Sequence, residues 1–169
     1  AKEMMVLAAA LTIQDPRERP AEVRGTADEM HARFTDDKSD FSSFLLLWQY
    51  INERQAELSS SQLRKMCHRE FINFLRIREW QDLFAQLREM GRTANIRVSN
   101  GRDIDASGRE VEIHKSLLSG LLSHVGAKEE REKTYGKAPR GPREYLGARG
   151  TKFAIFPGSG LFKQNPDWV

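Results

Sequence analysis

The strongest constraint on the fold is a set of apolar residues that recur every three or four positions. One set lies between residues 41 and 51, and a longer set between residues 72 and 90 is followed by Gly91, which is expected to end the helix. This spacing is typical of helices that bury one stripe against a core. The two sets are Phe41, Phe44, Leu45, Trp48 and Ile51, then Ile72, Leu75, Trp80, Leu83, Phe84, Leu87 and Met90. We therefore expect a mainly α fold with Trp48, Trp80 and Phe84 in its core.

Other stretches are also expected to be helical. Residues 3–13 carry an apolar helical pattern, and residues 21–34 are strongly charged with a narrow apolar stripe. Ser39 or Asp40 is expected to cap the helix that contains Phe41, and Ser59 with Gln62 has the spacing of a capping box. Helicity is expected to resume at residues 111–123, where Gly120 would allow close approach to a neighbour. These segments predict a bundle of at least five helices.

The pattern changes after residue 123. Tyr145 and Leu146 are followed by the four-residue turn 147–150 and by residues 151–156, which predicts a β-hairpin. We expect α+β organisation, with a helical domain over 1–123 and a β module over 124–169 that is cut short. Between the helices, residues 92–109 are expected to form a loop or an insertion.

Several kinds of chemistry are not expected in this chain. The sequence has one cysteine, Cys67, and its four histidines lack the spacing that places two ligands on one helical face, so no disulfide framework or metal site is expected. There is no apolar run of the length that crosses a bilayer, so no membrane partner is expected. The single cysteine favours a reducing compartment, and a cytoplasmic location is expected. No motif for cradling nucleotide phosphates or for nucleophilic catalysis occurs.

Positive charge is concentrated near the C-terminus. Residues 124–169 hold nine Lys and Arg against five Asp and Glu, whereas the rest of the chain has a slight acidic excess. Such a bias favours an anionic partner, nucleic acid foremost, although a solvated basic surface is nearly as common.

Five blocks occur in order along the chain: LTIQDPRERP at 11–20, Asp40-Phe41, FINFLRIREWQD at 71–82, LLSGLL at 117–122, and FPGSGLF at 156–162 with PDWV at 166–169. Together they resemble the accessory region that follows the two motor domains of DEAH-box RNA helicases, in particular those of the bacterial HrpA type. The resemblance implies a ratchet-like helical domain (1–123) followed by the start of an OB-fold (124–169).

The same resemblance implies a function. Relatives hold single-stranded RNA between this region and their RecA-like motor domains, so the expected partners are RNA and the motor of the same chain. ATP and Mg²⁺ would act in that motor, and no cofactor is expected in this chain. The expected function is a non-catalytic grip on single-stranded RNA during ATP-driven unwinding. The alternative is a protein interaction module that regulates the helicase.

Eight residues are candidates for binding RNA. They are Arg17, Arg19, Asn73, Arg76, Arg78, Lys152, Ser159 and Lys163. Arg17 and Arg19 lie on a loop bracketed by two prolines, where salt bridges to the bundle are an equally good explanation. Arg76 and Arg78 are expected inside a helix and to point in different directions, with an Arg78–Asp82 pair as the alternative.

The remaining candidates have structural alternatives too. Asn73 is expected in a helix interior, where its amide would reach a base edge or a backbone carbonyl. Lys152 is expected on the solvent face of a strand. Ser159 lies between glycines whose backbone N–H groups suit a phosphate, although a β-turn also explains it.

Overall fold

The fold is a helical bundle followed by a small antiparallel sheet, which confirms the predicted fold class. The computed structural model describes residues 1–98, 104, 108–129 and 143–169. Its helices are α1 (Lys2–Ala10), α2 (Arg24–His31), α3 (Asp40–Glu57), α4 (Ser60–Arg69), α5 (Phe74–Thr93) and α6 (Glu110–Gly120). Its strands are β1 (Ala127–Lys128), β2 (Glu144–Leu146) and β3 (Lys152–Ala154), and short 3₁₀ turns occupy Ala21–Val23, Ala32–Phe34, Leu122–His124 and Ala148–Gly150.

Side-chain caps define where three of the helices begin. The Ser39 hydroxyl accepts a hydrogen bond from the Ser42 amide at the start of α3, and Ser59 with Gln62 forms the predicted capping box at the start of α4. Asn73 caps α5, because its side-chain oxygen accepts from the Arg76 amide at 3.1 Å. The prediction of Asn73 in a helix interior was therefore wrong: its short side chain satisfies one of the free amides at the helix start.

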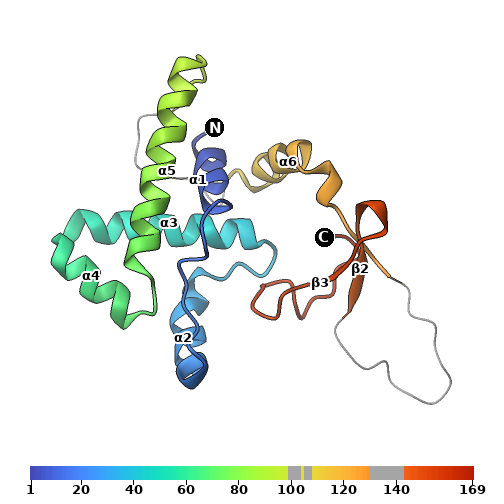
Figure 1. Cartoon of the computed structure of the whole chain (residues 1–169), viewed down its shortest axis with the longest axis horizontal. Helices are drawn as coiled ribbons and strands as arrows, with labels where there is room; N and C mark the ends of the chain where they lie inside the picture. The colour runs from blue at the N-terminus through green and yellow to red at the C-terminus, as the bar shows by residue number, and fades with distance from the viewer. Residues whose placement is uncertain (99–103, 105–107, 130–142) are drawn as a thin grey trace.

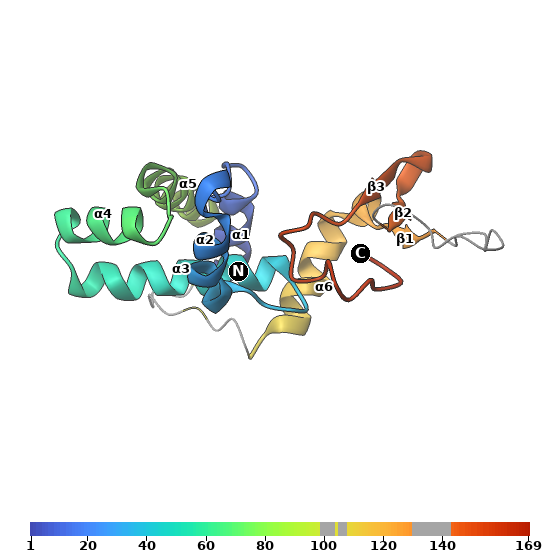
Figure 2. The ribbon, with the colours of Figure 1, turned by 90° about the horizontal axis from the view of Figure 1, so that it is seen from below.

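The core lies where α1 packs against α3, α5 and α6. Figure 1 shows α5 crossing over α3, and Figure 2 shows α4 running back alongside α3 as a helical hairpin. The Trp48 ring meets the rings of Trp80 and Phe84 edge-on at 4.9 and 5.0 Å. The buried Trp80 indole N–H donates to the Val6 carbonyl at 2.9 Å and ties α5 to α1. The predicted core positions of Trp48, Trp80 and Phe84 are confirmed.

Two glycines differ from expectation. Gly91 does not end its helix, since α5 continues to Thr93; the absence of a side chain there accommodates Met5 of α1, whose methyl group occupies the space of a Cβ. Gly120 was expected to permit a close contact, but no atom lies within 4 Å of where its Cβ would be. The apolar spacing correctly predicted the helices, and it carried no information on which glycine meets a neighbour.

The sheet has the order β1-β2-β3 and is antiparallel throughout. The predicted hairpin is confirmed, with Tyr145 opposite Phe153 across β2 and β3. Strand β1 was not predicted, because two residues are too few for an alternating pattern. Backbone hydrogen bonds also join Gly126 to Val169 and Lys128 to Asp167, so the last residues extend the sheet beyond β1. The OB-fold assignment stays a prediction.

Two predicted regions fall partly outside the described residues. These are the loop at residues 92–109, of which 99–103 and 105–107 are not described, and the basic region at residues 124–169, of which 130–142 are not described.

Candidate nucleic-acid interface

The proline-bracketed loop, residues 15–20, lies against the turn that connects α4 to α5. The Glu18 amide donates to the Phe71 carbonyl and the Asn73 amide donates to the Pro16 carbonyl, each at 2.8 Å. These two bonds pair the loop with the entry to α5 in the manner of an antiparallel ladder. The loop therefore has a fixed place on the bundle.

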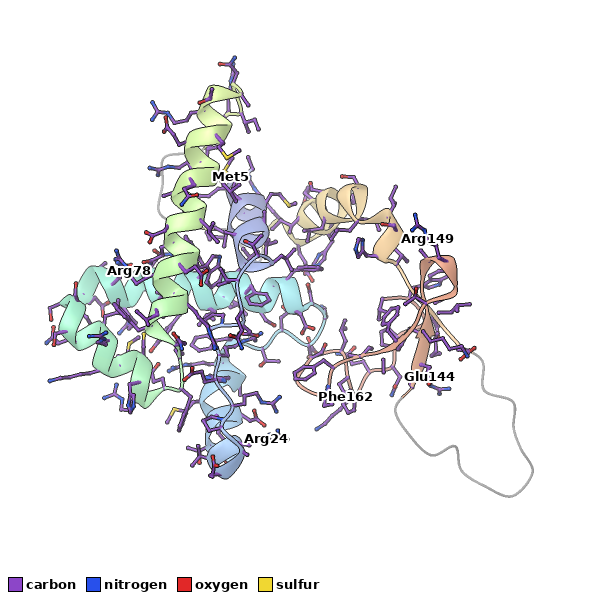
Figure 3. The ribbon with its side chains drawn as sticks, in the orientation of Figure 1. Met5, Arg24, Arg78, Glu144, Arg149 and Phe162 are labelled. Carbon is purple, nitrogen blue, oxygen red and sulfur yellow. The ribbon has the colours of Figure 1, made fainter. Side chains whose placement is uncertain are left out.

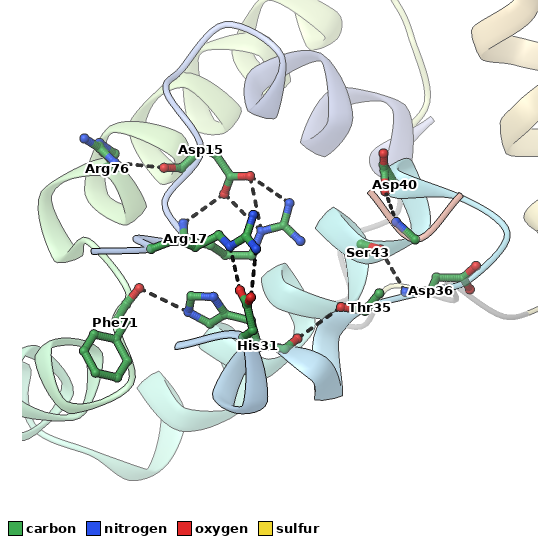
Figure 4. Close-up of polar contacts among 12 residues, drawn as sticks. Asp15, Arg17, His31, Thr35, Asp36, Asp40, Ser43, Phe71 and Arg76 are labelled. Carbon is green, nitrogen blue, oxygen red and sulfur yellow. Dashed lines mark hydrogen bonds and ion pairs between the residues drawn. The ribbon is translucent and has the colours of Figure 1, made fainter. Parts of the chain in front are cut away.

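Arg17 and Arg19 lie on this loop, and each has a carboxylate partner. The Arg17 guanidinium forms an ion pair with Asp15 at 2.7 Å, and its central carbon lies 5.0 Å from the centre of the Phe44 ring (Figure 4). Arg19 binds Asp28 through two nitrogens, at 2.5 and 2.8 Å. These hydrogen bonds lower the pKa of Asp28. The structural alternative that the sequence left open, salt bridges at the loop, is present for both arginines.

His31 contacts the turn between α4 and α5, against which the proline-bracketed loop lies. Its Nε2 lies 3.0 Å from the Glu70 carbonyl oxygen and 3.2 Å from the Phe71 carbonyl oxygen. Both oxygens can only accept, so Nε2 carries a proton and donates. Burial lowers the pKa of His31, which favours the neutral ring.

The C-terminal loop, residues 156–164, docks onto the residues around the start of α3. The Gly160 amide donates to the Asp40 carboxylate at 3.1 Å, and the Gln164 side-chain amide donates to the Asp37 carbonyl. A Cβ on Gly160 would overlap the Asp36 carbonyl oxygen and would lie 3.1 Å from the carbonyl carbon. Only glycine permits this close approach of the two backbones.

These two loops enclose a cleft of about 690 Å³, which we call the loop cleft. Its lining comprises Asp15, Arg17, Arg19, Asp28, His31, Ala32, Thr35, Asp40, Phe44, Phe156, Pro157, Gly158, Ser159 and Lys163. Four of the eight predicted RNA-binding residues therefore line one cavity: Arg17, Arg19, Ser159 and Lys163. The two arginines precede Ser159 and Lys163 by more than 130 positions in the sequence.

An exposed aromatic ring was missed by the sequence analysis. Phe156 is 68% exposed at the edge of the loop cleft. It lies just past strand β3, which was expected to extend over residues 151–156 but ends at Ala154. Single-stranded nucleic acids stack their bases on such rings beside basic side chains.

The charges of the loop cleft are balanced, because Asp15, Asp28 and Asp40 oppose Arg17, Arg19 and Lys163 in its lining. Asp15 and Asp28 pair with the two arginines, whereas Lys163 is exposed and forms no ion pair with any residue that the structure describes. An entering phosphate would therefore meet Lys163 directly and would share each arginine with its carboxylate. The arginine forks keep further N–H donors for such sharing.

The other candidates lie elsewhere. The Arg76 guanidinium donates to the Asp15 carbonyl at 2.9 Å and, with Asn73, contacts Glu18, so both residues hold the proline-bracketed loop in place. Arg78 is exposed on α5 and lies away from the loop cleft (Figure 3), and neither the alternative pair with Asp82 nor another ion pair involves it within the described chain. Lys152 forms an ion pair with Glu129 at 2.7 Å beside the sheet. RNA binding by these residues stays a prediction.

Ser159 has a local role in its turn. Its hydroxyl accepts from the Leu161 amide at 3.1 Å, and its own amide donates to the Phe156 carbonyl at 2.9 Å. With the Gly160 amide bound to Asp40, most donors expected for a phosphate here already have protein acceptors.

Among the described residues, no cluster of His, Cys, Asp or Glu could hold a metal ion. No helix there is long and apolar enough to cross a membrane.

No protein-family model matches the chain. Two bacterial proteins are similar to it over 99% of its length. They are the ATP-dependent RNA helicase HrpA homolog of Haemophilus influenzae, at 47% identity, and the ATP-dependent RNA helicase HrpA of Escherichia coli, at 46%. The chain spans 12% of the length of each relative. The resemblance to bacterial helicases of the HrpA type, inferred from five sequence blocks, is therefore confirmed for this segment.

Proposed function

We propose that the chain is a non-catalytic accessory region of an ATP-dependent RNA helicase and that it grips single-stranded RNA in the loop cleft. The relatives' names support the helicase context. ATP and Mg²⁺ would act in RecA-like motor domains elsewhere in the parent protein, and those domains would be the intramolecular partner of this region.

One observation carries the proposal. Residues selected from sequence as RNA contacts, at opposite ends of the chain, line a single cleft with an exposed aromatic ring at its edge. Cations that track a phosphate backbone beside an aromatic platform form the usual arrangement for binding single strands without base readout.

The ion pairs that Arg17 and Arg19 form with carboxylates determine how strongly the loop cleft is expected to bind RNA. Because Asp28 already occupies Arg19, a phosphate gains less from that arginine than from the unpaired Lys163. We therefore expect weak binding of the isolated chain that falls steeply with salt, at about −0.7 in log-log slope for each phosphate neutralised.

The test is a fluorescence anisotropy titration of the chain with a short labelled oligouridylate at several salt concentrations. Replacing Arg19 and Lys163 together by Ala should weaken binding and make the salt slope shallower by roughly 0.7 for each lost contact. Phe156→Ala should weaken binding by about 1–3 kcal/mol with little change in the salt slope, because it removes stacking and no charge.

The control pair is Arg88→Ala with Lys115→Ala. Both side chains are exposed on α5 and α6 outside the loop cleft, and the pair removes the same charge. Equal weakening by the control and the cleft variants would show that binding is non-local and would refute the cleft as the site.

Separate titrations of Arg78→Ala and Lys152→Ala test the remaining predicted contacts. ATP hydrolysis by the pure chain would overturn its assignment as non-catalytic.

A further inference from the structure

A second cavity lies in the hairpin of α3 and α4, and we call it the hairpin pocket. Its volume is about 510 Å³, and it shares no lining residue with the loop cleft. Nothing in the proposed RNA grip uses it.

Basic side chains dominate the rim of the hairpin pocket. Arg54 comes from α3, and Lys65 and Arg69 come from one face of α4, four residues apart. Among the described residues, the only carboxylate in the lining belongs to Glu70, which is buried and already accepts hydrogen bonds from the Tyr50 hydroxyl at 2.9 Å and from Arg33. Glu70 also forms an ion pair with Arg69 at 3.6 Å. The pocket therefore has an excess of positive charge.

One donor at this rim is open to an anion, and a second lies buried beneath it. Arg54 Nη1 pairs with Glu57 at 2.9 Å, but the Arg54 Nε atom is buried and has no acceptor among the described residues. Lys65 is exposed and forms no ion pair within the described part of the chain. A buried donor without an acceptor is costly, so an anion that reaches Arg54 Nε would gain a charge-assisted hydrogen bond.

The rest of the lining distinguishes between anionic ligands. Leu58 and Met66 contribute apolar surface. Tyr50 is the only aromatic residue in the lining, and the guanidiniums of Arg33 and Arg54 lie over its ring at 4.4 and 5.8 Å. The ring therefore offers little surface for stacking an RNA base, and a backbone phosphate would leave the apolar part uncovered.

We propose that the hairpin pocket binds an acidic peptide segment of a protein partner. A carboxylate of the segment accepts a hydrogen bond from Lys65 Nζ and, when the partly exposed Arg54 side chain turns from Glu57 toward it, a second one from Arg54 Nε. A neighbouring apolar side chain packs on Leu58 and Met66. The pocket is thus a protein-docking site separate from the RNA cleft.

The probe is the acetylated tripeptide amide Glu-Leu-Glu, titrated into the ¹⁵N-labelled chain and followed by NMR. The peptide should shift the amide resonances of α3 and α4, and the shifts should saturate with a roughly millimolar dissociation constant. The peptides Gln-Leu-Gln and Glu-Gly-Glu, which remove the charge and the apolar side chain respectively, should each bind at least severalfold more weakly.

The decisive variant is Lys65→Glu with Arg69→Glu, whose side chains are exposed. Arg69 also lies 3.6 Å from the buried Glu70 carboxylate, so the amide spectrum of the variant is recorded first, to verify that α3 and α4 keep their fold. It should weaken Glu-Leu-Glu by roughly tenfold or more, whereas the charge-matched control Arg88→Glu with Lys115→Glu should bind normally. Absence of saturable binding, or equal loss in both variants, would overturn the proposal. It would also be overturned if oligouridylate, and not the peptide, shifted the amides of the hairpin pocket.

Discussion

Replacing Gly160 by alanine is expected to detach the C-terminal loop from the helical bundle. The added Cβ would overlap the Asp36 carbonyl oxygen and would lie 3.2 Å from the Asp37 Cα. These are backbone atoms, so no side-chain rotation relieves the overlap. The loop must move by roughly 1 Å to restore van der Waals separation.

The cost follows from the bonds that this movement breaks. The Gly160 amide donates to the Asp40 carboxylate at 3.1 Å, and a hydrogen bond to a charged group contributes about 1.5–3 kcal/mol. We expect the docking equilibrium of the loop to weaken by that amount, which is roughly ten- to hundredfold. RNA affinity should fall as well, because Ser159 and Lys163 move away from Arg17 and Arg19.

Amide hydrogen exchange measured by NMR tests this expectation. The Gly160 amide should exchange faster in Gly160→Ala, while exchange of the core of α3 and α5 should change little, because their contacts do not involve the loop. Gly120→Ala is the matched control: nothing lies within 4 Å of its added Cβ, and alanine is the better helix former by up to about 1 kcal/mol.

The two glycine variants should therefore change stability in opposite directions. If Gly160→Ala showed the same amide exchange and thermal stability as Gly120→Ala, the close approach of residue 160 to residues 36 and 37 would be wrong. The docking of the C-terminal loop that encloses the loop cleft would then be wrong as well.

Two further predictions concern the bundle. Burial lowers the pKa of His31, so below about pH 6.5 the unfolded chain takes up a proton that the folded chain does not. The free energy of unfolding, measured by urea denaturation at each pH, should therefore fall from about pH 6.5 to about pH 5.5 and stay level above that range. This dependence on pH should disappear in His31→Gln. An unchanged slope in that variant would assign the dependence to other groups. Trp80→Ala should cost about 3–5 kcal/mol in urea denaturation, because the side chain is 1% exposed, whereas Trp168→Ala, at a residue 68% exposed, should cost about 0.5 kcal/mol or less. Similar losses in the two variants would contradict the assigned core.

Short-range sequence signals predicted much of the fold. The apolar spacing around Trp48 and Trp80 located α3 and α5, and Ser59 with Gln62 located the start of α4, because these signals act within a few turns of one helix. Strand β1 was missed, since its pairing with β2 depends on a partner 19 residues away and not on its own two residues.

The sequence by itself determined the residue types available for binding and the helical framework that carries them. The tertiary structure alone decided how they are used: it brought Arg17 and Arg19 to within one cleft of Ser159 and Lys163, and it gave Asn73 and Arg76 the structural task of holding the proline-bracketed loop. The physical reason is that helix spacing and capping are local, whereas a cleft or an ion pair depends on which distant backbones pack together. Gly160 shows this most directly. A side chain at this position would overlap the backbone of Asp36, which lies more than 120 positions earlier in the chain.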